Sequence, residues 1–207
     1  MIQIKALTVS RISYKAMPVK ISRDIALIKF RKLPLREYDE INDIEIFHYP
    51  KYFSFHWIKL EKPTNKKLTT EFKRLIQLLG VEKLVVFGQI NKPWISGFTR
   101  ERNDLKSLTK AIEYFTSISI KKKFNGALEL YTKEIDTFIS NFYTLTACDS
   151  GFSDYYIIDV DQTILFHIHY SGEIKILTLN KDIQKKLSSH IAKTKFIDAL
   201  RERTDRL

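Results

Sequence analysis

The stretch Gly151–Asn180, GFSDYYIIDVDQTILFHIHYSGEIKILTLN, predicts three consecutive β-strands joined by two tight turns. Over 163–170 the side chains alternate, so that one face of the strand is apolar and the other is mixed. Residues 155–158 form an unbroken apolar run, which is typical of a central strand buried on both faces. The turn chemistry of Ser171–Glu173 precedes a third alternating segment at 174–179. We therefore predict a three-stranded antiparallel meander.

Apolar residues at helical spacing predict four helices along the rest of the chain. They are expected at about 65–79, 103–115, 133–145 and from Asn180 toward Leu200. Further strands are expected at 25–31, 43–49, 51–60, 83–88, 117–124 and 127–131. Segments 43–49 and 51–60 are candidates to pair with each other, and Asn125-Gly126 is the strongest two-residue turn signal. Because the strands come in clusters and hairpins, we predict an α+β fold of one or two antiparallel sheets, with the C-terminal meander, covered by about four helices.

The composition is that of a folded protein, with 44% hydrophobic and 13% aromatic residues. At 207 residues the chain is expected to form a single domain over 1–207, with 116–126 as the only candidate seam. Its single cysteine, Cys148, excludes an internal disulfide and a cysteine-rich zinc module. No apolar run approaches the roughly 20 residues that cross a bilayer, and the first residues lack a signal-peptide core. We therefore expect a cytoplasmic protein without a membrane partner.

The charge is strongly positive and unevenly distributed. The formal net charge is +11 at pH 7, and residues 1–36 hold nine Lys/Arg against one acid, whereas residues 37–50 hold five acids and no Lys/Arg. Such an excess favours attraction to an acidic partner, which is a nucleic acid, an anionic lipid surface or an acidic protein. The cationic residues proposed to contact that partner are Lys121, Lys122, Lys123, Arg201, Arg203 and Arg206.

One segment carries a catalytic signature. The sequence YYIIDVDQT resembles the first motif of the haloacid dehalogenase superfamily of phosphatases, which implies that Asp159 attacks phosphate and Asp161 is the general acid/base. Only 44 residues follow Thr163, however, and they contain no adjacent acidic pair, which the family's later strands supply. Gln162 also replaces the usual glycine. The alternative is a hairpin turn in which an aspartate caps backbone donors, and we predict that turn and no catalytic residue.

Two other groups of residues are candidate sites. His167 and His169 have the i, i+2 spacing of a strand chelate, but the only later histidine is His190, so no metal site is predicted. Cys148 would need a neighbouring histidine to act as a nucleophile, and its surroundings match no hydrolase motif. The chain has no glycine-rich phosphate loop, and no cofactor is predicted.

Aromatic residues alternate in the segment KYFSFHW, where Phe53, Phe55 and Trp57 share one face of a strand beside Lys51. The segment is similar to the octamer of RNA-recognition domains, whose aromatic side chains stack on bases. It departs from that octamer at Tyr52 and Ser54, where the family has small residues. We therefore predict that these aromatic side chains are buried in the core.

In its layout the chain resembles immunity proteins of bacterial toxin systems such as contact-dependent growth inhibition. The likeness rests on an α+β pattern without an active-site motif, ending in DYYIIDVDQTILFHIHYSGEIKILTLN and a helix. It implies a non-enzymatic protein that neutralises a cognate toxin domain, and the basic charge implies that this partner has an acidic surface. The alternatives are a nucleic-acid-binding protein that contacts phosphates through its cationic surface and a hydrolase that uses Asp159 and Asp161.

Overall fold

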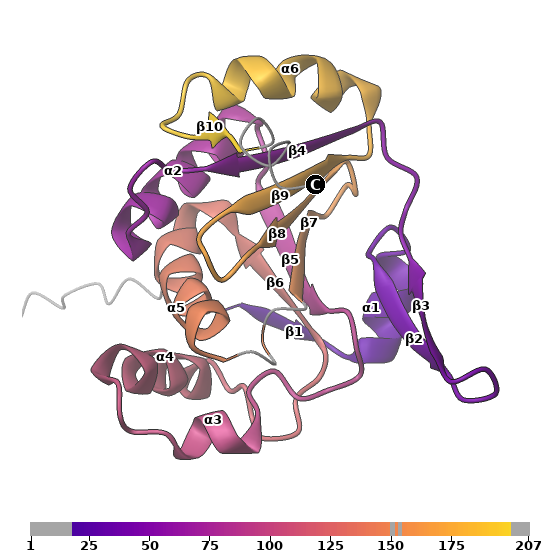
Figure 1. Ribbon diagram of the computed structural model, residues 1–207, viewed down its shortest axis with the longest axis vertical. Helices are drawn as coiled ribbons and strands as arrows, with labels where there is room; N and C mark the ends of the chain where they lie inside the picture. The colour runs from indigo at the N-terminus through magenta and orange to yellow at the C-terminus, as the bar shows by residue number, and fades with distance from the viewer. Residues whose placement is uncertain (1–17, 150–151, 153–154, 200–207) are drawn as a thin grey trace, which may run out of the picture.

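An eight-stranded antiparallel sheet forms the centre of the molecule (Figure 1). The computed structural model describes residues 18–149, 152 and 155–199. The strand order is β1-β6-β5-β7-β8-β9-β4-β10. The strands span Val19–Ile21 (β1), Ser54–Lys59 (β4), Lys83–Gly88 (β5), Ala127–Tyr131 (β6), Tyr155–Asp159 (β7), Ile164–Ile168 (β8), Ile174–Thr178 (β9) and Ile197–Asp198 (β10).

The predicted C-terminal meander is confirmed as β7, β8 and β9, and the α+β class is confirmed with it. Leu165 of β8 lies opposite Ile158 of β7 and Leu177 of β9, so these three side chains share one face of the sheet. All five residues of β7 are buried, as its unbroken apolar run predicted. The register therefore follows directly from the alternation in the sequence.

Four helices cover one face of the sheet (Figure 1). They are α2 (Asn65–Leu78), α4 (Lys106–Ser117), α5 (Ile135–Cys148) and α6 (Lys181–Ile191), close to the four that the helical periodicity predicted. Phe72, Phe115, Phe138 and Leu187 are buried from these helices against the apolar side of the meander. Asn180 caps α6, because its side-chain oxygen accepts hydrogen bonds from the backbone of the first turn.

The opposite face is covered only in part. A second hydrophobic cluster joins the sheet to the short helix α1 (Arg23–Lys29), and a two-stranded hairpin of β2 (Leu35–Asp39) and β3 (Ile44–His48) projects on this side (Figure 1). The sequence predicted a strand at 25–31, which is wrong. Ala26 and Phe30, spaced i and i+4, face the sheet, and Ser22 caps the helix, so burial outweighs the strand propensity of the isoleucines.

Three other expectations are corrected. Residues 118–124 form turns between α4 and β6 and not a strand, because the backbone N–H groups of Ser119 and Ile120 bond back to the last turn of α4 and Ser119 has a positive φ of 64°. The C-terminal helix ends at Ile191, and β10 follows it. The segments around β3 and β4 do not pair with each other, since β3 pairs with β2, and β4 lies between β9 and β10. A further short helix, α3 (Gly97–Glu101), was not predicted.

Candidate binding surfaces

The partly covered face of the sheet carries a group of aromatic side chains where β7, β8, β9 and β4 lie side by side. Trp57 of β4 lies opposite Lys175 of β9, which lies opposite His167 of β8, so all three point to this face. The ring of Tyr49, which follows β3, lies beside them and is 45% exposed. We call this surface the aromatic face, and its members are Tyr49, Phe55, Trp57, Tyr156, His167, His169 and Lys175.

The rings of the aromatic face contact one another around a central cation. The Lys175 ammonium lies 5.0 Å from the ring centre of Tyr49 and 5.5 Å from that of Phe55. Trp57 lies 6.0 Å from Phe55 and 6.2 Å from His169, measured between ring centres, and its Nε1 donates a 2.7 Å hydrogen bond to Glu173. These contacts hold the rings in a fixed arrangement, which lowers the entropy lost when such a surface binds a partner.

The prediction that the β4 aromatics are buried in the core is wrong. Phe55 and Trp57 are half-buried, and Phe53, which precedes β4, is 41% exposed with the Lys181 ammonium 5.8 Å from its ring centre. The alternation correctly predicts which side chains share a face of the strand, but it does not indicate which face is covered by other elements. All four large helices lie on the other face, so the aromatic side of β4 is left partly open.

The Asp-x-Asp segment forms the turn between β7 and β8. Asp159 is buried, and one of its carboxylate oxygens accepts hydrogen bonds from the backbone N–H groups of Thr163 (2.7 Å) and Ile164 (2.9 Å). The other oxygen accepts a 2.8 Å hydrogen bond from the Thr163 hydroxyl. Asp161 is exposed, and Gln162 has a positive φ of 54°. Both oxygens of Asp159 therefore serve the turn, as the turn interpretation expects.

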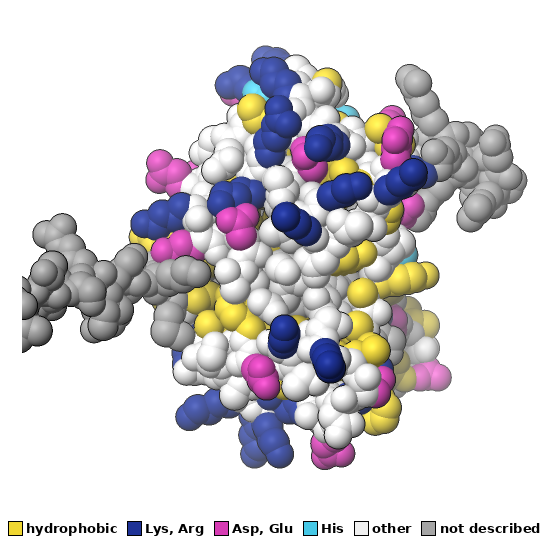
Figure 2. Space-filling view, turned by 90° about the vertical axis from the view of Figure 1, so that its left-hand side faces the viewer, with side chains coloured by type: hydrophobic (Ala, Val, Ile, Leu, Met, Phe, Trp, Pro, Cys, Tyr) yellow, Lys and Arg dark blue, Asp and Glu magenta, His cyan; other side chains and the backbone are white. Residues whose placement is uncertain are grey.

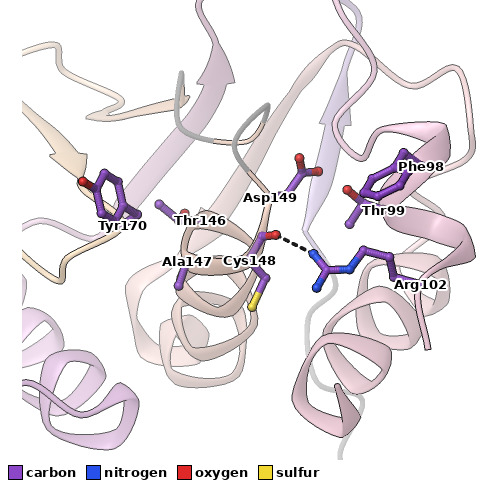
Figure 3. Close-up of a pocket in the computed structure, with 8 residues that line it drawn as sticks. All are labelled: Phe98, Thr99, Arg102, Thr146, Ala147, Cys148, Asp149 and Tyr170. Carbon is purple, nitrogen blue, oxygen red and sulfur yellow. Dashed lines mark hydrogen bonds between the residues drawn. The ribbon is translucent and has the colours of Figure 1, made fainter. Parts of the chain in front are cut away.

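A pocket of about 540 Å³ lies between the end of α5 and α3, and Cys148 is among its lining residues (Figure 3). Arg102 spans this gap, because its Nη1 donates a 2.9 Å hydrogen bond to the carbonyl of Cys148 while its other nitrogens bind Asp104. Figure 3 shows the Cys148 sulfur and the Asp149 carboxylate pointing in different directions. No histidine is among the described residues that line this pocket, so the base that a cysteine nucleophile needs is not placed beside it.

His167 and His169 lie on the aromatic face, where their rings contact other rings. His167 lies 5.1 Å from Tyr156 between ring centres, and His169 Nδ1 lies 2.7 Å from the Ser171 hydroxyl. Within 18–149, 152 and 155–199, no three His, Cys, Asp or Glu side chains are grouped to hold a metal ion.

Ser54, His56 and Asp198 have the residue types of a hydrolytic triad, which the sequence analysis did not single out. His56 Nε2 lies 3.2 Å from Ser54 Oγ; burial lowers the pKa of His56, and the Asp198 charge acts in the opposite direction. Ser54 Oγ also lies 2.7 Å from the hydroxyl of the fully buried Thr178. This cross-strand hydrogen bond ties β4 to β9, which gives the serine a structural role.

The structure describes three of the six predicted contact residues. Lys121, Lys122 and Lys123 are exposed in the connection after α4, at the end of the molecule opposite α6 (Figure 1). Arg201, Arg203 and Arg206 lie outside the described residues.

Tyr114 lines a cavity of about 480 Å³ between α4 and α5. Burial, with the nearby Glu134 charge, raises the pKa of Tyr114 to about 12. The unfolded chain, with a tyrosine pKa near 10, therefore releases this proton first, and stability is lost as the pH rises from about 10 to 12. We expect the free energy of unfolding, measured with urea at about pH 9 and about pH 11, to fall more steeply in the wild type than in Tyr114→Phe. If the free energy of unfolding fell equally between the two pH values in the wild type and in Tyr114→Phe, the raised pKa of Tyr114 would be contradicted.

The β2–β3 hairpin, which we call the acidic hairpin, is the acidic segment recognised in the sequence. Glu37, Asp39, Glu40, Asp43 and Glu45 all lie in it. It also exposes apolar side chains, since Ile41 is 93% and Ile44 is 52% exposed. A hydrogen bond of 3.1 Å between the hydroxyls of Tyr49 and Tyr156 fixes its base beside the aromatic face.

Comparisons of this chain with protein-family models, with curated proteins and with solved structures gave no match. In the part of the chain that the structure describes, none of the helices combines the length and the hydropathy required to span a bilayer.

Proposed function

We propose that this chain is a non-enzymatic binding protein that neutralises a specific protein partner, as an immunity protein inhibits its cognate bacterial toxin. The observation that carries the proposal is the aromatic face. Tryptophan and tyrosine are the residues that contribute most to protein interfaces, and here Trp57 and Tyr49 are partly exposed and held in place by their neighbours. The exposed side of an antiparallel sheet is otherwise expected to be polar.

The chemistry of the partner follows from the charges on this surface. Lys175 lies among the rings, where an approaching carboxylate gains a hydrogen-bonded ion pair in a partly desolvated setting. The partner therefore presents an acidic group surrounded by apolar surface, in agreement with the acidic partner that the net charge suggests. Beside it, the acidic hairpin favours basic residues at the edge of the same interface. An inhibitor of this kind acts in the cell that makes it, so a cytoplasmic location belongs to the proposal.

Replacing Trp57 with alanine is expected to weaken partner binding strongly. Truncating a central aromatic residue of an interface costs about 2 kcal/mol or more, which is a loss of at least roughly 30-fold in affinity. Wild-type and variant baits would be compared in pull-downs from the native host, treated with nuclease, at low and moderate salt. The retained protein would then be purified, its affinity measured by calorimetry, and its toxicity tested with and without co-expression of this chain.

The matched control is Tyr131→Ala, because Tyr131 is also an exposed aromatic (41%) but lies on β6, away from the aromatic face. It should retain the partner with wild-type affinity. Lys175→Gln should weaken binding and reduce its dependence on salt. Equal loss with Trp57→Ala and Tyr131→Ala, or a retained protein that is not toxic, would overturn the proposal.

A further inference from the structure

A second surface, on the helical side, concentrates the positive charge. Segments 59–74 and 181–198 carry eleven Lys/Arg and four Asp/Glu, whereas all the described residues carry 29 Lys/Arg and 21 Asp/Glu. Two segments thus account for +7 of a described net charge of +8. In Figure 2, Lys and Arg side chains outnumber Asp and Glu side chains over the upper part of this side, where α2 and α6 lie; a further group of Lys and Arg side chains lies at the lower end. We call this surface the basic end, and its cations are Lys62, Lys66, Lys67, Arg74, Lys185, Lys186, Lys193 and Lys195.

The fold brings these distant segments together. Glu71 of α2 is buried, and its carboxylate accepts a 3.0 Å hydrogen bond from the backbone N–H of Lys195, in the turn after α6. Lys62, Lys67 and Lys195 line one shallow pocket of about 350 Å³ beside β10. Lys62, Lys67 and Lys195 are therefore neighbours in space, although they come from segments that are far apart in the chain.

Most of these cations have no acidic partner among the described residues. Within the basic end, Lys185 pairs with Asp182, and the Lys195 ammonium lies 4.0 Å from Glu71. The other six form no ion pair within the described part of the chain: Lys62, Lys66, Lys67, Arg74, Lys186 and Lys193. Burial and the charges of Lys193 and Lys186 lower the pKa of His190, so both lysines lie near this imidazole. Because these charges are not neutralised by acids among the residues that the structure describes, they attract an external polyanion.

The type of polyanion follows from what the basic end lacks. None of the large hydrophobic side chains that are exposed in the described residues comes from 59–74 or 181–198. A membrane-binding helix would expose apolar residues to the bilayer, and a site for single strands would offer aromatic rings to the bases. A surface of cationic side chains that offers no exposed aromatic ring matches the backbone of a duplex, because a duplex presents closely spaced phosphates and no unstacked base.

We propose that the basic end binds double-stranded nucleic acid through its phosphate backbone, at a surface separate from the aromatic face. Binding would be independent of sequence, since contacts to phosphates carry no sequence information. This inference does not depend on the proposed neutralising function.

The test uses a short fluorescein-labelled DNA duplex and fluorescence anisotropy over a range of salt concentrations. With about six cations on phosphates, the logarithm of the binding constant should fall with the logarithm of salt concentration with a slope of about −5. The variant Lys67→Gln/Lys186→Gln/Lys193→Gln should lose roughly tenfold or more in affinity and bring the slope to about −3. All three side chains are exposed and unpaired within the described residues, so folding should be unchanged.

The matched control is Lys92→Gln/Lys106→Gln/Lys110→Gln, which removes the same charge from exposed positions on α4 and in the loop before α3, at the opposite end of the molecule from α6. It should leave affinity and slope close to those of the wild type. An equal loss with both triple variants would show that net charge alone causes binding and would overturn the proposal. The absence of duplex binding, tighter binding to single-stranded RNA, or stronger binding to phosphatidylserine-containing vesicles would also overturn it.

Discussion

Replacing Trp94 with alanine is expected to lower the free energy of unfolding by about 5 kcal/mol, a large part of the total stability of a domain this size. Trp94 is 1% exposed and lies 4.6 Å from Tyr155 and 5.9 Å from Phe152 between ring centres. Its Nε1 donates a 2.7 Å hydrogen bond to the carbonyl of Gly126. The variant therefore leaves a cavity and also a buried carbonyl without its partner.

Guanidinium denaturation followed by circular dichroism measures this loss. Trp57→Ala is the natural comparison, because the chain has two tryptophans and Trp57 is only half-buried, so its truncation should cost about 1–2 kcal/mol. If Trp94→Ala does not fold, Trp94→Phe keeps a ring, loses the hydrogen bond and should cost about 2 kcal/mol. A smaller loss for Trp94→Ala than for Trp57→Ala would contradict the packing described here.

The periodicity of apolar residues predicted correctly those helices and strands in which most apolar residues of the pattern are also buried in the fold. β7 has an unbroken apolar run and is buried on both faces, and β8 alternates because its two faces differ. Helix α2 was found to within a residue, since its apolar stripe is followed by Gly80, which has a positive φ of 71°. In these segments the pattern and the tertiary environment agree.

Helix α1 and the aromatic face were missed for a related reason. Ile25 and Ile28 suggested a strand, but they are 58% and 68% exposed, and the contacts that set the conformation are those of Ala26 and Phe30 with the sheet. Likewise, nothing in the alternation at β4 tells which side the helices cover. Both features depend on long-range packing, which a local pattern does not contain.

Of the two charged surfaces, the one formed by a continuous segment was predicted and the one formed by distant segments was not. The acidic hairpin is one continuous segment, so counting charges along the chain found it. The basic end was missed, because its two halves are more than 100 residues apart and are joined by the hydrogen bond from Lys195 to Glu71 of α2 and by the pairing of β4 with β10. Short runs such as Lys121–Lys123 were conspicuous in the sequence, but they lie apart from the larger concentration of charge.

Asp159→Ala is expected to lower the free energy of unfolding by about 3–4 kcal/mol, whereas Asp161→Ala should change it by less than about 0.5 kcal/mol. The first variant removes three hydrogen bonds and leaves the buried N–H of Ile164 without an acceptor. The second removes an exposed carboxylate. A phosphatase of the type that the motif resembles would need both carboxylates, and so the two variants would be equally inactive.

Urea denaturation of the two variants, with a phosphate-monoester hydrolysis assay alongside, separates these explanations. If Asp159 only caps the turn, the two variants should differ in stability. Neither substitution should then remove a phosphate-monoester hydrolysis activity. Asp159→Asn retains one carbonyl oxygen for the backbone donors and should therefore recover more than half of the loss. Equal destabilisation by Asp159→Ala and Asp161→Ala would reject the turn explanation. If the wild type hydrolyses the ester and both substitutions abolish this activity without loss of stability, the catalytic explanation would be supported instead. Only a shared reaction makes the exposed Asp161 and the buried Asp159 equally necessary.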